Sequence, residues 1–126
     1  MIVIETSALI DSLSGPRRSW SVLRRAIESG ERILMPSLVL FEWLRGPRLP
    51  AEVALQEELL PSKSAVIFGP GEAALSAELY KRVRRPRGRE IDLAIAATAI
   101  VSNAHLWTLN TADFTDIPGL RLFVGN

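Results

Sequence analysis

The chain has no cysteine, a single histidine and no long apolar run, and each absence excludes a class of function. Without cysteine there is no disulfide, no thiol nucleophile and no zinc or iron–sulfur site with sulfur ligands. With His105 as the lone histidine, a multi-histidine metal site within the chain is excluded. A membrane span needs about 18 apolar residues, but the longest candidate, residues 91–101, is interrupted by Asp92 and Thr98. The composition does not exclude a metal site with oxygen ligands.

The N-terminus passes directly into apolar residues 2–4, with neither a basic region nor a small-residue cleavage site. This beginning is not typical of a secretory leader, so we expect a cytoplasmic protein with no membrane partner. The 126 residues suit one domain, because domains cluster near ~100–150 residues. Apolar residues make up 48%, the ordinary share for a packed globular protein. We therefore predict a single domain over residues 1–126.

Short β-branched runs alternate with helical patterns along the chain. We expect strands at residues 2–4, 33–35, 65–68, 106–109 and 120–124. We expect helices between Pro16 and Gly30, from Pro36 to Arg45, and over 51–60, 72–84 and 91–103. This alternation predicts an α/β fold with three layers, α/β/α, and a central, mostly parallel five-stranded sheet. In such sheets the functional site lies beyond the carboxyl ends of the strands.

Four acidic residues lie near those strand ends. Glu5 follows the first strand directly, and Glu42 lies in an otherwise apolar helix after the second. Asp92 lies in the first turn of the most apolar helix, and Asp113 follows the fourth strand. Each alone has an ordinary explanation, such as a helix cap, a turn or an ion pair. Gathered at one edge, however, they would repel one another unless a cation neutralised them.

The natural cation for such a cluster is Mg²⁺ or Mn²⁺, because both favour oxygen ligands. A metal site of this kind suits hydrolysis of phosphodiester bonds. Six of the 15 basic residues fall within residues 81–89, directly before the helix that carries Asp92. These basic residues either form a solvated charged loop or hold a nucleic-acid backbone beside the metal. The candidates for phosphate contacts are Arg85, Arg87 and Arg89.

Segments 4–10, 42–46, 87–99 and 108–114 together resemble the PIN domain, and most closely its VapC-type toxin branch. The resemblance implies a metal-dependent endoribonuclease of a toxin–antitoxin pair, blocked by a small antitoxin and commonly a homodimer. By position, Glu5 and Asp92 match the metal ligands, and Glu42 and Asp113 match the other acids. The polar residues that support the ligands or the attacking water are matched by Ser7, Thr108 and Asn110.

One position departs from the family pattern, since Glu5 stands where the family normally has Asp. The alternative is therefore a catalytically weakened or inactive PIN-fold module that binds RNA or protein. A phosphoaspartate phosphatase is disfavoured, because it would want Asp at the positions of both Glu5 and Ser7. The large apolar side chains either belong to the core or form a partner surface. They are Trp20, Phe41, Trp43 and Leu44.

Overall fold

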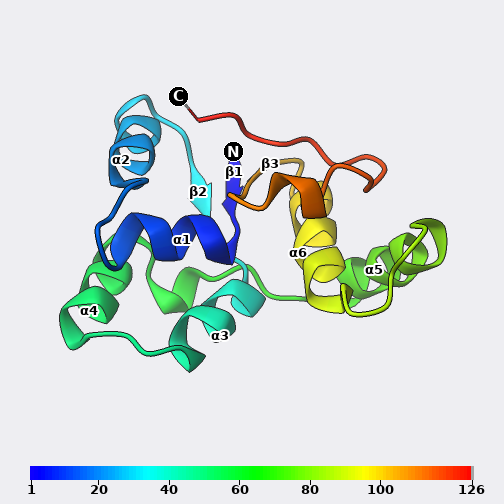
Figure 1. Cartoon of the computed structure of the whole chain (residues 1–126), viewed down its shortest axis with the longest axis horizontal. Helices are drawn as coiled ribbons and strands as arrows, with labels where there is room; N and C mark the ends of the chain where they lie inside the picture. Colours follow the sequence, from blue (N-terminus) through cyan, green and yellow to red (C-terminus); the bar gives the residue numbers. More distant parts are fainter. Residues whose placement is uncertain (126) are drawn as a thin grey trace.

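Three short parallel strands form the centre of the computed structural model, which describes residues 1–125 (Figure 1). They are β1 (Ile2–Ile4), β2 (Ile33–Leu34) and β3 (His105–Trp107), in the order β2-β1-β3. Ile2 pairs with Ile33 on one side and with His105 on the other. All three residues of β1 are buried, as expected of a central parallel strand that is covered on both faces.

The prediction of five strands was wrong in number, although the α/β class and the parallel direction are confirmed. Residues 65–68 and 120–124 contribute only single parallel bridges, Val66 with Pro36 and Leu122 with Leu106. The first bridge cannot extend beyond Pro36 in the C-terminal direction, because a helix begins at Ser37. The second lies beside β3, which is itself only three residues long. Both bridges widen the sheet at its edges without adding a regular strand.

Within residues 1–125, six α-helices surround the sheet. They are α1 (Thr6–Leu13), α2 (Trp20–Glu28), α3 (Ser37–Arg45), α4 (Pro50–Leu59), α5 (Pro70–Arg82) and α6 (Glu90–Val101). We did not predict α1, which follows Glu5 without a linker. Proline opens α4 and α5, and in each the third helical residue, Glu52 or Glu72, accepts the backbone N–H ahead of the helix. None of the helices within residues 1–125 has the length and hydrophobicity that a bilayer crossing requires.

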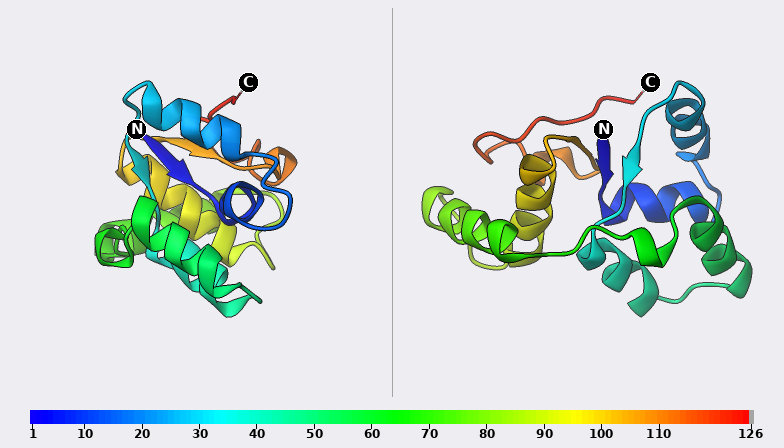
Figure 2. Two further views of the ribbon diagram at one scale, coloured as in Figure 1. Left: turned by 90° about the vertical axis from the view of Figure 1, so that its left-hand side faces the viewer. Right: turned by 180° about the vertical axis from the view of Figure 1, so that it is seen from behind.

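Helices cover both faces of the sheet, with α2 on one face and α6 on the other (Figure 2). Residues 93–99 of α6 are all buried, which explains why the helix is apolar around its whole circumference. The helix packs against β1 and β3, and α5 covers its outer side. This packing holds the first turn of α6, and with it Asp92, in a fixed position relative to the sheet.

Candidate active site

Glu5 is the most enclosed acid of the site, with 5% of its surface exposed. It follows β1 directly and precedes the first residue of α1, so its backbone is extended. Its Oε1 accepts hydrogen bonds from the hydroxyl of Ser7 and from that of Thr108, the latter at 2.6 Å. Within residues 1–125 no donor reaches Oε2 of this carboxylate, which leaves that oxygen available to a ligand.

The two hydroxyls are themselves held by the backbone after β3. Leu109 N–H donates to Ser7 Oγ at 2.9 Å, and Asn110 N–H donates to Thr108 Oγ1 at 3.0 Å. Because each hydroxyl then has its proton free to point at Glu5, the turn fixes both donors. Asn110 takes part through its backbone only, and its side chain is exposed. The structure thus brings Ser7 and Thr108 together as supports of Glu5, but not the amide of Asn110.

Asp92 is half-buried in the first turn of α6, and its surroundings raise its pKa to about 6. Burial is the largest cause, because an ionised carboxylate loses solvation there. The negative charges of Glu5, Asp113 and Glu42 raise it further, in that order, whereas Arg89 acts in the opposite direction. The four predicted acids therefore lie close enough to repel one another at Asp92.

Glu42 and Asp113 lie toward the rim of this cluster. Thr6 Oγ1 donates to Glu42 Oε1 at 2.6 Å, which ties α3 to the start of α1. Arg45 lies 3.4 Å from Oε2 of the same carboxylate. Asp113 is exposed and ends the 3-10 turn η2 (Thr111–Asp113). Both side chains contribute charge to the site, and of the two only Glu42 has a close hydrogen bond of the kind that surrounds Glu5.

The arginines of the basic loop differ in whether they have a partner within the chain. Arg89 is held within the chain, because its guanidinium binds both carboxylate oxygens of Asp116 at 2.6 and 2.9 Å. Its predicted phosphate contact therefore competes with an existing ion pair. Arg85 and Arg87 are both exposed, and among the described residues neither guanidinium has a partner. Of these two arginines, Arg85 lines a cavity beside Asp113, and Arg87 does not.

That cavity has a volume of about 520 Å³ and opens between the end of α5, the start of α6 and η2. It is lined by Arg84, Arg85, Arg89, Ala112, Asp113 and Asp116. Since Asp116 is paired with Arg89, the unpaired charges on its wall are two arginines and one aspartate. The cavity joins a positive surface to the edge of the acidic cluster.

Three contributors were missed from the sequence: Thr6, Arg84 and Asp116. Arg84 belongs to the basic run and was as visible as Arg85. Thr6 and Asp116 carried no local signal, because their partners lie 36 and 27 residues away. Such contacts exist only once the elements have packed.

The donor set fits a small divalent cation within limits. In the described residues, no group of three or more acidic or histidine side chains is arranged to hold a metal ion. Mg²⁺ commonly uses only one or two carboxylates and completes its shell with water and substrate phosphate. Glu5 and Asp92, whose charges act on each other, provide such a pair. The residues therefore fit a two-carboxylate site and not a closed cage of four acids.

The chain has a parallel sheet with helices on both faces. Carboxylates from four separate segments repel one another at the site. These two features define a class of α/β domain with an acidic site. Within that class the chain belongs to the PIN domain family, whose family model matches residues 2–120. It is 34% identical over 123 residues to Ribonuclease VapC19 of Mycobacterium tuberculosis, covering 96% of this chain and 98% of that protein. The predicted family membership is confirmed.

Solved structures share the fold. VapBC2 from Rickettsia felis, bound to a DNA fragment from their promoter, matches with a TM-score of 0.74 and 24% identity, over 98% of both chains. DNA-bound VapBC from Salmonella typhimurium matches with a TM-score of 0.79 and 19% identity, over 97% of this chain and 96% of that one. A toxin–antitoxin complex from Klebsiella pneumoniae matches with a TM-score of 0.67 and 25% identity, over 95% of each chain.

Proposed function

We propose that this chain is a divalent-metal-dependent endoribonuclease and the toxin of a toxin–antitoxin pair. The observation that carries the proposal is the coupling of Asp92 to three acids from other segments, Glu5, Asp113 and Glu42. Repulsion of this kind costs stability, and a cation site is the functional reason to keep it. The name of the relative Ribonuclease VapC19 supports RNA as the substrate.

In this proposal Glu5 and Asp92 hold Mg²⁺ or Mn²⁺. When bound, the metal would lower the pKa of a water ligand and stabilise charge on the phosphoryl oxygens. Ser7 and Thr108 keep the Glu5 carboxylate in one orientation through Oε1. Glu42 and Asp113 complete the acidic cluster and orient water near the reacting phosphate. Each protein group thus either holds the metal or positions another group of the site.

RNA would approach from the side of the basic loop. Arg84 and Arg85 line the cavity next to Asp113, so a phosphate bound there lies beside the acidic cluster. Arg87 is exposed outside the lining of that cavity, and we keep it as a contact to a more distant phosphate. Such contacts position the backbone without reading the bases, so they do not define the cleaved sequence.

An antitoxin would cover the exposed apolar side chains of α3 and of the segment that follows it. Phe41, Leu44 and Leu49 are 55%, 49% and 65% exposed, whereas Trp43 is buried and Trp20 is half-buried. The predicted partner surface is therefore reduced to Phe41 and Leu44, with Leu49 added. The toxin–antitoxin complex among the structural neighbours supports a protein partner of this class. The homodimer stays a prediction, which sedimentation of the partner-free protein would check.

The test is a cleavage assay with purified, partner-free protein on structured and single-stranded RNAs, with Mn²⁺, with Mg²⁺ and with EDTA. The Asp92→Asn variant serves as the matched control, since it removes the charge and keeps the shape. We expect metal-dependent cleavage by the wild type alone. Full activity of Asp92→Asn would refute the site. No cleavage by folded wild type would favour the binding module, for which Glu5 in place of Asp is the specific motivation.

A further inference from the structure

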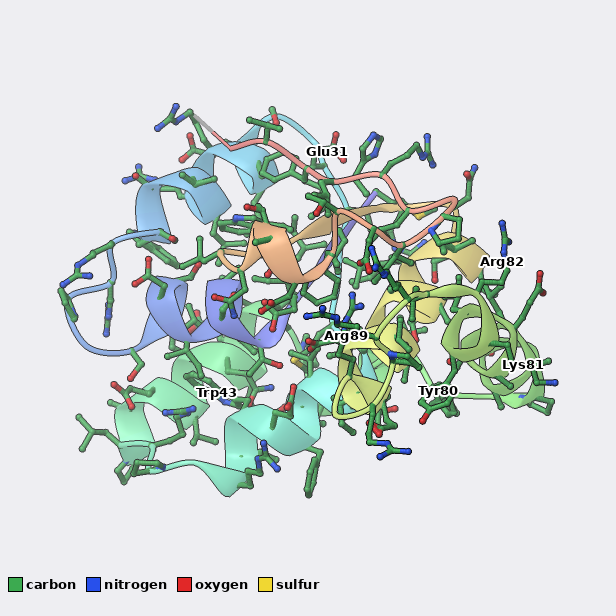
Figure 3. The ribbon with its side chains drawn as sticks, turned by 45° about the vertical axis from the view of Figure 1, so that its right-hand side comes forward. Glu31, Trp43, Tyr80, Lys81, Arg82 and Arg89 are labelled. Atoms are coloured by element: carbon green, nitrogen blue, oxygen red, sulfur yellow. The ribbon has the colours of Figure 1, made fainter. Side chains whose placement is uncertain are left out.

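One guanidinium connects the two segments that carry Asp92 and Asp113. Arg89 lies three residues before Asp92, and Asp116 lies three residues after Asp113. Nη2 of Arg89 donates to Asp116 Oδ1 at 2.6 Å and to the backbone oxygen of Asp113 at 2.8 Å. Nη1 donates to Asp116 Oδ2 at 2.9 Å. Figure 3 shows Arg89 between the turn η2 and the start of α6.

The same side chain also closes its own loop. Nη1 lies 3.4 Å from the backbone oxygen of Arg85, so the loop before α6 is held at both of its ends. The Arg89 side chain is 20% exposed although it lies in a loop, whereas Asp116 is 46% exposed. A guanidinium with this many protein acceptors has few donors left for RNA.

We propose that Arg89 is a positioning residue that sets Asp113 relative to Asp92 by clamping η2 onto the start of α6 through Asp116. The inference rests on the proposed nuclease function of the site and replaces the phosphate contact predicted for this arginine. The clamp uses the planar fork of arginine, which binds a carboxylate with two parallel hydrogen bonds. A lysine at position 89 would keep the positive charge but could not form the two parallel hydrogen bonds.

The clamp is expected to act locally. Its partners are partly exposed, and exposed ion pairs contribute little to global stability. Variants of Arg89 and Asp116 should therefore fold. A displacement of about 1 Å in an active site can cost roughly 10²-fold in rate, so the effect should appear in kcat.

The first experiment compares Arg89→Lys and Asp116→Asn with the wild type in kcat, KM and the salt dependence of RNA binding. A clamp predicts that both variants lower kcat by roughly 10- to 100-fold, with KM and the salt slope nearly unchanged. A phosphate contact predicts a higher KM for Arg89→Lys. It also predicts tighter RNA binding for Asp116→Asn, because that substitution would release the arginine. Either of these two results would overturn the proposal.

The control is the ion pair between Arg24 and Glu28 on α2, which is of similar length at 2.7 Å and lies at the exposed surface. Glu28→Gln removes a surface pair without touching the site. It should leave kcat and KM at their wild-type values. A loss of kcat in this variant equal to that of Asp116→Asn would contradict the clamp, since it would assign the effect to ion pairs in general.

The second experiment does not depend on activity. The amides of Asp113 and Phe114 donate within η2, to Asn110 and Thr111, so their hydrogen exchange reports the order of that turn. In RNA-free protein, both clamp variants should exchange at least about tenfold faster at these amides, and Glu28→Gln should not. Wild-type exchange rates in both clamp variants would refute the clamp. If the wild type cleaves no RNA, the proposed function fails, and the exchange result still decides whether the clamp orders η2.

Discussion

The hydroxyl of Thr108 lies 2.6 Å from Oε1 of Glu5 and so joins the carboxyl ends of β3 and β1. The same oxygen accepts the hydroxyl of Ser7. Glu5 is nearly enclosed, and a buried carboxylate depends on such donors in place of water. Thr108 therefore helps to determine where this carboxylate points.

Thr108→Val should destabilise the protein while keeping its shape. The substitution removes a donor from Glu5 and an acceptor from the N–H of Asn110, and it leaves these partners in place. We expect the free energy of unfolding to fall by about 1–3 kcal/mol, the cost of an unsatisfied buried group. Urea unfolding measures it. Thr111→Val, at an exposed position, is the control, and an equal loss in both variants would contradict the role of Thr108.

The stability of the metal-free protein should depend on pH through Asp92. Its pKa is raised from 3.8 to about 6 in the folded chain, so the folded state binds this proton more tightly than the unfolded state does. The resulting stabilisation is complete below about pH 4 and is lost as the pH rises through 6.

Urea unfolding in EDTA at pH 5 and at pH 7.5 would measure this dependence. Asp92→Asn cannot titrate and is the reference. The wild type should lose stability relative to Asp92→Asn on going to pH 7.5, because its ionised carboxylate is then poorly solvated in its buried position and is repelled by Glu5 and Asp113. A stability difference that does not change with pH would show that Asp92 is not perturbed in this way.

Glu5→Asp should lower cleavage even though Asp is the usual residue of the family at this position. Removing one methylene withdraws the carboxylate by ~1.5 Å, away from the hydroxyls of Ser7 and Thr108 that hold it. Catalytic groups need placement within about 0.5 Å, so we expect a loss of kcat with Mn²⁺. A gain of activity would instead mean that this chain is a weakened member, the alternative raised from the sequence.

Arg84 and Arg85 should contribute more to RNA binding than Arg87 does. Both line the cavity beside Asp113, and Arg87 does not. Each lost phosphate contact should reduce the slope of log K against log salt by about 0.7 for a single strand. Binding of a single-stranded RNA at several salt concentrations measures this slope for each alanine variant.

The control for these three variants is Arg24→Ala, an exposed arginine on α2. It should leave the slope unchanged. If Arg84→Ala and Arg85→Ala also leave the slope unchanged, the cavity does not bind phosphate. The basic loop would then be a solvated charged surface, as its composition alone allows.

Much of the site could be predicted from the sequence, because the patterns that mark its residues lie in their near neighbours. Glu5 directly follows a β-branched run, and Asp92 opens a helix that is apolar all round, so both positions follow from burial and strand direction. The sheet was less predictable, because bridges as short as Val66 with Pro36 have no periodicity of their own. Helix α1 was missed because it begins directly after Glu5, with no breaker between strand and helix.

The sequence by itself determined the α/β class, the parallel strands and the four acids at one edge, because these depend on the polarity and spacing of near neighbours. The tertiary structure decided which polar groups serve those acids. Thr6 meets Glu42 across 36 residues, and Arg89 turns to Asp116 across 27. Such pairs depend on how helices and turns pack against the sheet. No pattern of adjacent residues specifies that packing. For this reason Arg89, which the sequence predicts to be a phosphate ligand, binds Asp116 in the structure.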